Sequence, residues 1–157
     1  MKHFTCENFP ESNLGLLIGR AHALKDRLLE KHLVDEDITA AQFKVLIIMQ
    51  MTDVDTPAEL CRYLALDSGA MTRMLDRLEQ KGFIVRERCD DDRRQIRLVL
   101  TGEGQRLAGR LPQIGAEAMN EMVGVLEPAE LASLEQILKK ILLTAGDSVT
   151  VMRIGDK

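Results

Sequence analysis

Apolar residues recur at intervals of three and four along most of this chain, a pattern that predicts a mainly helical protein. The first such run covers residues 12–32 and predicts a helix of about 30 Å at 1.5 Å per residue. This helix needs a partner surface, because its apolar stripe must be buried. The stripe consists of Leu14, Leu17, Ile18, Ala21, Leu24 or Lys25, and Leu28.

Two further helix starts carry capping signals. Thr39 and Gln42 have the spacing of a capping box, which opens a second helix. Thr56 is a suitable N-cap for a third helix, since Pro57 behind it is favoured at the first helical position. This third helix can run only to about Leu64, because another start signal follows closely.

That start signal is Asp67, which is suited to cap a fourth helix ending at Gly82. Two helices separated by two or three residues have the spacing of a helix-turn-helix. The buried stripe of the fourth helix is predicted to contain Met71, Met74, Leu75 and Leu78. Its outer face is small or basic, so it could approach base edges closely and offer guanidinium groups to them. The candidate DNA-contacting residues on this helix are Ser68, Gly69, Ala70, Thr72, Arg73 and Arg77.

Residues 83–89 and 96–100 predict two β-strands joined by a charged loop. An isolated two-stranded hairpin is marginally stable, so this one must pack on the helices. Its loop contains Asp92, Arg93 and Arg94, which we add to the candidate DNA-binding residues. A helix-turn-helix followed by a basic hairpin predicts a winged helix-turn-helix lobe over residues 37–101.

The remaining third of the chain is again helical in pattern. Thr101 can cap a long helix, and Pro112 is expected to kink or break it near Arg110. Pro128 is expected to start a last helix. The two ends of the chain, residues 1–10 and 146–157, are expected to be loose.

The charge distribution supports a polyanionic partner although the net charge is −4. Residues 1–60 carry 6 Lys/Arg and 10 Asp/Glu, and residues 111–157 carry 4 and 7. Residues 61–110 carry 11 and 8, a surplus of three positive charges. The basic middle section therefore coincides with the predicted winged lobe.

Other classes of protein find less support in the sequence. The longest apolar runs are too short to span a bilayer and no secretory signal is evident, so we expect a soluble cytoplasmic protein. The three cysteines, Cys6, Cys61 and Cys89, are widely spaced and predict neither disulfides nor a metal site. No residue arrangement typical of catalysis stands out, so we expect neither enzymatic activity nor a cofactor.

The hairpin carries the most specific motif. Asp92, Arg93 and Arg94 are followed by Leu100-Thr101 in the pattern DxRxxxxxLT, with Gly104 close behind. With this motif, residues 14–143 resemble the MarR family of bacterial transcriptional regulators.

The resemblance implies a homodimer on a palindromic operator in double-stranded DNA. Residues 11–36 and 102–145 would form an intertwined helical dimerisation region, and the fourth helix would enter the major groove. Arg94 would enter the minor groove, while Asp92 would hold the wing by pairing with an arginine, for which Arg86 is the candidate.

The resemblance also implies a repressor whose DNA affinity is lowered by a small aromatic or phenolic effector. Arg20 and His22 are candidate ligands for its carboxylate, although the simpler interpretation is a surface arginine and a partly buried histidine. One alternative is a redox-sensing regulator that uses Cys6. Two alternatives of other classes are a helical adaptor that does not bind DNA and a thiol enzyme.

Overall fold

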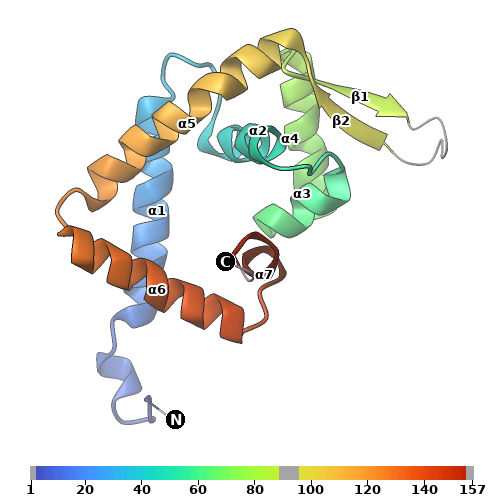
Figure 1. The fold of residues 1–157 in the computed structure, drawn as a ribbon. Coiled ribbons are helices and arrows are strands. Elements are labelled where there is room, and N and C mark those ends of the chain that lie inside the picture. The colour runs from blue at the N-terminus through green and yellow to red at the C-terminus, as the bar shows by residue number, and fades with distance from the viewer. Residues whose placement is uncertain (1–2, 89–95, 155–157) are drawn as a thin grey trace.

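The computed structural model describes residues 3–88 and 96–154 of the chain, and in this part it is mainly helical with one β-hairpin (Figure 1). The predicted fold class is therefore confirmed. The elements in chain order are η1 (Phe9–Glu11), α1 (Leu14–His32), α2 (Ala40–Met51), α3 (Pro57–Leu64), α4 (Ser68–Gln80), β1 (Ile84–Arg88), β2 (Ile96–Leu100), α5 (Gly102–Val123), α6 (Pro128–Thr144) and α7 (Ser148–Ile154). No helix among the described residues is long and apolar enough to cross a membrane.

Local capping signals set the starts of α2, α3 and α4, as the sequence predicts. The Thr39 hydroxyl accepts a hydrogen bond from the Gln42 N–H, and the Gln42 side chain accepts one from the Thr39 N–H, which completes the capping box. Thr56 caps α3, and its hydroxyl also donates to the Glu59 carboxylate at 2.7 Å. These starts need no tertiary contact to explain them.

A winged helix-turn-helix lobe is built from α2, α3, α4 and the hairpin (Figure 1). Its core residues come from every one of these elements, so the helices and the wing share one apolar interior. The two strands are antiparallel, with Ile84 opposite Leu100 and Arg88 opposite Ile96. Fully buried core side chains include Leu46, Leu60, Met71, Leu75, Leu78 and Ile84.

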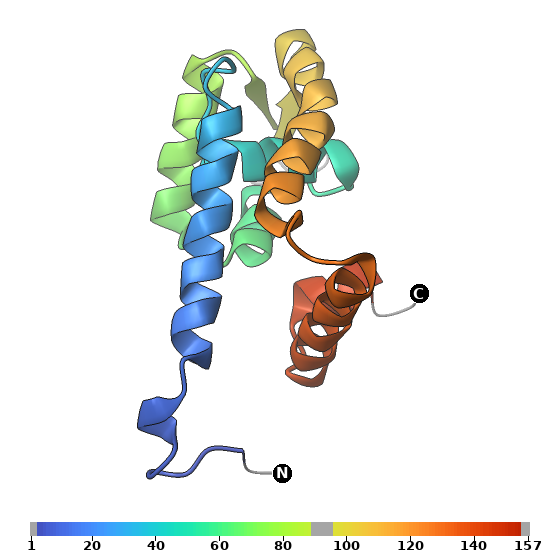
Figure 2. The same cartoon turned by 90° about the vertical axis from the view of Figure 1, so that its left-hand side faces the viewer.

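The helices α1 and α5 pack against each other, and the lobe lies on one side of this pair (Figure 2). Leu28 and Leu29 near the end of α1 and Leu111 on α5 are buried in the same core as the lobe. Polar contacts then tie α1 to α2: Lys44 pairs with Asp26 at 2.8 Å, and Glu30 accepts a hydrogen bond from the Ala40 N–H at 2.7 Å. These contacts fasten the second half of α1 to the first helix of the lobe.

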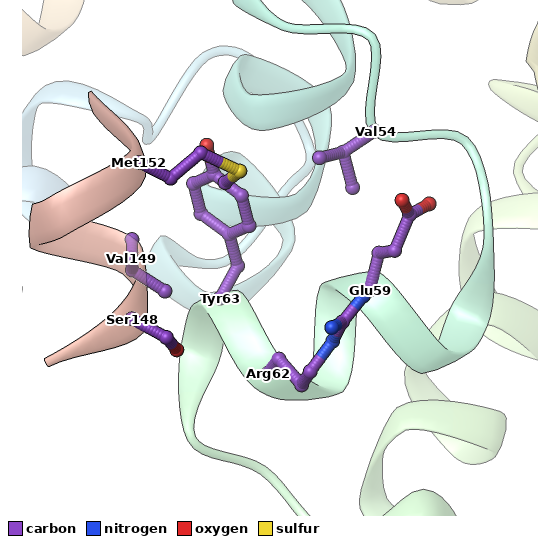
Figure 3. Close-up of a pocket in the computed structure, with 7 residues that line it drawn as sticks. All are labelled: Val54, Glu59, Arg62, Tyr63, Ser148, Val149 and Met152. Atoms are coloured by element: carbon purple, nitrogen blue, oxygen red, sulfur yellow. The ribbon is translucent and has the colours of Figure 1, made fainter.

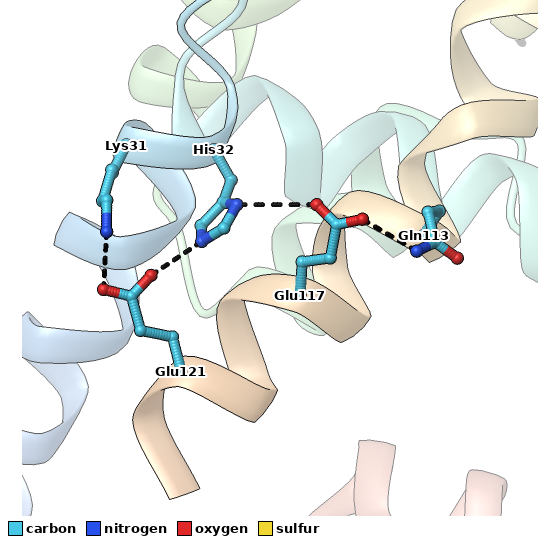
Figure 4. A network of polar contacts seen from close by, with 5 residues as sticks. All are labelled: Lys31, His32, Gln113, Glu117 and Glu121. Atoms are coloured by element: carbon cyan, nitrogen blue, oxygen red, sulfur yellow. Dashed lines mark hydrogen bonds and ion pairs between the residues drawn. The ribbon is translucent and has the colours of Figure 1, made fainter. Parts of the chain in front are cut away.

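A polar network also joins α1 to α5 (Figure 4). Glu121 on α5 binds Lys31 at 2.7 Å and His32 at 2.8 Å, and His32 faces Glu117 at 3.7 Å on its other side. The hydrogen bonds from Lys31 and then His32 hold the pKa of Glu121 below its usual range.

Two expectations about the C-terminal third are corrected in part. Of the two outcomes expected at Pro112, a kink or a break, the break is wrong, because α5 runs unbroken from Gly102 to Val123. Leu107, Ala108 and Leu111 are buried beside the proline, so tertiary packing offsets the lost backbone hydrogen bond.

The second correction concerns the end of the chain, which is not loose over its whole length. Residues 148–154 form α7, and Asp147 starts this helix by accepting a hydrogen bond from the Thr150 N–H at 2.7 Å. The other end fits the expectation better, because residues 3–10 are all exposed.

Candidate nucleic-acid interface

The outer face of α4 is the main candidate surface for DNA. Its inner face is fixed by Met71, Leu75 and Leu78, which are buried in the core. Of the predicted contact residues, Ser68, Gly69, Thr72, Arg73 and Arg77 are exposed and Ala70 is half-buried. The structure thus places all six predicted α4 residues on one helix, five of them in its N-terminal half and Arg77 in its last turn.

Asp67 fixes the N-terminus of α4. Its carboxylate accepts a hydrogen bond from the Ala70 N–H at 2.9 Å, and chiefly for this reason the pKa of Asp67 lies below its usual range. The positive charge of Arg73 lowers this pKa further. The aspartate therefore stays ionised at neutral pH and orients the helix end that carries Ser68 and Gly69.

A small hollow lies between the start of α2 and the outer face of α4. Its volume is about 150 Å³. Its walls combine small side chains with the two arginines, so a phosphate group could approach them here. The α2 residues could not be predicted from the sequence, because their proximity to α4 is a property of the fold. The lining residues are Thr39, Ala41, Gln42, Ala70, Arg73, Met74 and Arg77.

Arg86 has partners other than the expected ones. From β1 its guanidinium group donates to Asp76 and to Glu79 on α4, at 2.7 Å in both cases. The Arg86 N–H also donates to Glu79. Among the described residues, the two carboxylates of α4 hold the Arg86 guanidinium. The expected pairing with Asp92 stays a prediction, because Asp92 lies outside the described residues.

This arrangement gives Arg86 a structural place beside the interface. It fastens the first wing strand to α4, and it neutralises acidic side chains that would repel phosphate. The exposed Arg73 and Arg77 remain on the outer face of the same helix. In the structure Arg86 thus positions the wing on α4, and its listing as a candidate DNA-binding residue stays a prediction.

The second strand of the wing is fastened to the loop before α3. The Leu98 N–H donates to the Asp55 carbonyl at 2.7 Å, and Arg97 lies 3.5 Å from the Asp55 carboxylate. The hairpin thus has an anchor on each strand. The predicted wing residues Asp92, Arg93 and Arg94, together with Cys89, lie outside the described residues.

The two candidate effector residues are on the surface of α1. Arg20 is exposed, and the His22 side chain is 65% exposed and 3.6 Å from Asp26. The interpretation of His22 as partly buried is therefore wrong. Neither residue lines the hollow beside α4 or the cavity between α3 and α7 described below.

The described cysteines differ in their surroundings. Cys6 is exposed in the turn before η1, whereas Cys61 is half-buried against the core, as expected for a small apolar residue. Within residues 3–88 and 96–154 no group of three or more His, Cys, Asp and Glu side chains has the arrangement of a metal site.

Comparisons with known proteins agree with this geometry. A family model described as "MarR family" matches residues 38–96, which cover the lobe from the start of α2 to the wing. The multiple antibiotic resistance protein MarR of Escherichia coli (strain K12) is 42% identical over 130 residues, which are 82% of this chain and 90% of that protein.

Solved structures show the same fold. The apo form of E. coli MarR has a TM-score of 0.72 at 42% identity and covers 82% of this chain and 96% of its own. A variant of E. coli MarR in complex with operator DNA has a TM-score of 0.78 at 40% identity, with coverages of 88% and 99%. BpsR of Bordetella bronchiseptica shares the fold at 23% identity with a TM-score of 0.75, covering 83% of this chain and 98% of its own.

Proposed function

This chain belongs to the MarR family, and on that premise we propose that it is a homodimeric transcriptional repressor of a palindromic operator. The observation that carries the proposal is the exposed, basic face of α4 in a lobe similar to one solved with operator DNA. As a DNA-binding regulator it would act in the cytoplasm, and the proposal includes no catalytic step.

We assign the major groove to α4. Arg73 and Arg77 are one turn apart, and the small residues Gly69 and Ala70 leave the start of the helix free to approach base edges. Arginine binds guanine through two hydrogen bonds, which discriminates between bases. Arg94 in the wing is assigned to the minor groove on the family pattern, and Arg93 to the neighbouring phosphates.

Homodimerisation is supported by apolar surface outside the lobe. The start of α1 exposes Leu14, Leu16, Leu17 and Ile18, and α6 has no buried residue at all. Figure 2 shows the first half of α1 and α6 extending beyond the lobe. A monomeric protein rarely leaves this much apolar surface in water, and twofold pairing would cover it. We therefore propose residues 11–36 and 102–145 as the dimerisation region.

The proposed regulation is conformational. A dimer with its two α4 helices about 34 Å apart matches one turn of DNA. A small aromatic or phenolic acid that binds better to a dimer with another spacing would lower operator affinity by its differential affinity for the two states. BpsR, whose DNA binding is regulated by 6-hydroxynicotinic acid, is an example of such control within this fold.

Operator binding by arginine variants tests the proposal. Arg73→Ala should weaken operator binding by about 1 to 3 kcal/mol, chiefly at particular base pairs. Arg94→Ala should weaken binding to all sequences and reduce the salt slope by about 1. Genomic fragments selected by the purified protein would supply the operator, and gel-shift titration would measure affinity.

Arg153→Ala is the matched control, because Arg153 is an exposed arginine on α7, outside both the lobe and the proposed dimerisation region. It should leave operator affinity within about twofold of the parent, since distant surface substitutions have small effects. If all three variants bound the operator equally well, the assignment of α4 and the wing to DNA would be wrong.

A further inference from the structure

The helix α7 joins the end of α6 to the helix-turn-helix. It follows α6 after residues 145–147, and it faces α3 across a cavity of about 190 Å³ (Figure 3). We call residues 146–154, which comprise α7 and the turn before it, the clasp. The clasp therefore lies between the proposed dimerisation region and the lobe.

The helix α6 depends on the clasp for its position. Among the described residues, none on α6 is buried, and this helix packs more closely against α7 than against any other element. At its other end, residues 124–127 link it to α5. Figure 2 shows α6 set apart from the pair formed by α1 and α5. The contacts that hold α6 in place are therefore concentrated at its C-terminal end.

The turn between α6 and α7 has a defined geometry. Gly146 adopts a left-handed conformation with φ of 70°, and the Asp147 N–H donates to the Leu142 carbonyl at 3.0 Å. The Gly146 N–H donates to the Leu143 carbonyl, which completes a Schellman cap on α6. Asp147 then caps α7 by accepting a hydrogen bond from the Thr150 N–H. Because both helices are capped within this short turn, α6 follows the position of α7.

The clasp contacts the helix-turn-helix through apolar side chains. Val149 and Met152, one turn apart on α7, line the cavity from one side, and Val54 and Tyr63 line it from the other. Figure 3 shows Val149 and Met152 pointing toward Tyr63. Tyr63 in turn packs against the core of the lobe. A continuous path of contacts thus runs from α6 through α7 to the interior of the helix-turn-helix.

This contact is weak enough to open. Protein interiors contain few voids larger than a water molecule, whereas the cavity leaves the apolar side chains of α7 without partners on one side. Val149 is only half-buried, and Met152 is 63% exposed. A helix of seven residues is also unstable in isolation. Undocking of the clasp should therefore unfold α7 and release the end of α6.

We propose that the clasp holds α6 in the position in which this helix binds a second copy of the chain. Docking of α7 on α3 orders α6 before the copies meet, so the dimer forms without that cost. The inference rests on the proposed function in one respect, namely that α6 belongs to the dimer surface. It makes the helix-turn-helix a support for dimerisation as well as the part that binds DNA.

Tyr63 provides a direct probe of the docked clasp. It is the only tyrosine in the chain, which has no tryptophan, so tyrosine fluorescence reports on the contact between α3 and α7. Val149→Asp places a carboxylate in this contact, which is costly to bury, and should open the clasp. Quenching of Tyr63 fluorescence by acrylamide should then increase. The same comparison in the background of Ile137→Glu, which removes an exposed apolar side chain of α6, measures the effect in a monomer.

The strength of the dimer tests the role of the clasp. Val149→Asp should raise the dissociation constant of the dimer by about tenfold, because only the fraction of chains with α6 in place can pair. Sedimentation equilibrium measures this constant. Val149→Leu extends an apolar side chain into the cavity and should tighten the dimer, and it adds no charge that could prevent folding.

Val151→Asp is the matched control. It introduces the same carboxylate on the same helix, but the Val151 side chain is 47% exposed and does not line the cavity. Both the quenching of Tyr63 and the dissociation constant should stay within about twofold of the parent, since exposed positions tolerate substitution. Any general effect of aspartate on the stability of α7 would appear in this control as well.

The outcomes separate this inference from the proposed function. Increased quenching and a weaker dimer in Val149→Asp, but not in Val151→Asp, support the clasp. Unchanged quenching would show that α7 is not docked on α3, and increased quenching with an unchanged dimer would show that docking does not position α6. Either result overturns the inference and leaves the repressor proposal standing.

Two further results are informative. If Val149→Asp increased quenching in the dimer but not in the Ile137→Glu background, α7 would dock on α3 of the second copy, which contradicts a clasp within one chain. If the parent dimerised and the clasp variants behaved as expected, but no DNA fragment were bound, the repressor proposal would fail and the clasp would stand.

Discussion

Gly104 shows how one residue sets the distance between two elements. It lies in the first turn of α5, where a β-carbon would be only 1.9 Å from the carbonyl oxygen of Phe83. That carbonyl also accepts a hydrogen bond from the Thr101 N–H, and the Thr101 hydroxyl donates to the Gly82 carbonyl. The start of α5 is therefore locked against the end of α4 and the first wing strand.

Gly104→Ala should destabilise the protein, because the added methyl group forces α5 away from the hairpin. We expect a loss of about 1 to 3 kcal/mol in the free energy of unfolding, the usual cost of overpacking. Urea denaturation followed by circular dichroism measures it. Gly109→Ala on the same helix is the control: its β-carbon meets nothing within 4 Å, so the substitution should stabilise by about 0.5 to 1 kcal/mol. Equal stability of the two variants would contradict the packing argument.

Residues whose role is local were predictable from the sequence. Thr39, Thr56 and Asp67 cap helices by accepting hydrogen bonds from backbone N–H groups three positions further along the chain. Both partners of each hydrogen bond can therefore be read from a short stretch of sequence. Arg86 is the counterexample, since its partners Asp76 and Glu79 are brought to it by the turn between α4 and β1. These contacts can be recognised only in the folded structure, where β1 lies beside α4.

At the scale of elements, the α1–α5 pair is held by charge as well as by apolar packing. Glu121 stands at the centre of the network in Figure 4, between Lys31 and His32. Because these hydrogen bonds lower the pKa of Glu121 in the folded protein, its contribution to stability is present above its unfolded pKa of 4.5. The contribution is lost as the pH falls through the lower, folded pKa.

The predicted consequence is a pH-dependent effect of Glu121→Gln. The variant should melt below the parent at neutral pH, and the difference should shrink as the pH falls below about 4.5, when the parental carboxyl group is protonated too. Thermal melts across the acidic range measure this gap. The control is Glu135→Gln, an exposed residue of α6, which should show no gap at any pH. A difference in melting temperature between Glu121→Gln and the parent that increased at acidic pH would contradict a stabilising role of the ionised Glu121.

The elements that sequence patterns misjudged are those decided by tertiary contacts. Pro112 is a helix breaker in isolation, but Ala108 and Leu111 beside it are completely buried and keep α5 continuous. The helix α7 has only seven residues and a short apolar pattern, so its periodicity was too weak to predict it. Its packing beside α3 is visible only in the fold.

At the scale of the whole molecule, the apolar surface of α6 points to a second copy of the chain. Ile137 at the middle of this helix is 57% exposed, and its neighbours Leu134, Ile141 and Leu142 are exposed as well. The apolar stripe of α6 could be predicted from the sequence, but its exposure could not, because it depends on how α6 is placed relative to α5. Where the copies meet was therefore expected from the family resemblance and not from periodicity.

Ile137→Glu should shift the protein toward the monomer, because a charge in an apolar interface is costly to bury. Sedimentation velocity measures the mass, and the operator affinity should fall with it, since a monomer binds one half-site. Gln136→Glu adds the same charge at the adjacent exposed position and is the matched control. A dimer of unchanged mass in Ile137→Glu would place the interface elsewhere.

Because the exposed apolar stripe of α6 is the proposed dimer surface, the fraction of the protein that is dimeric should depend on how many copies of the chain the cell contains. Assembly follows mass action, so at low concentration the dimer population scales with the square of the monomer concentration. A cell that halves its supply of the chain would then lose about three quarters of its dimers in the dilute limit. Separated chains would expose their apolar helices to proteases and to aggregation, so the surface that builds the proposed dimer would also shorten the lifetime of unpaired copies.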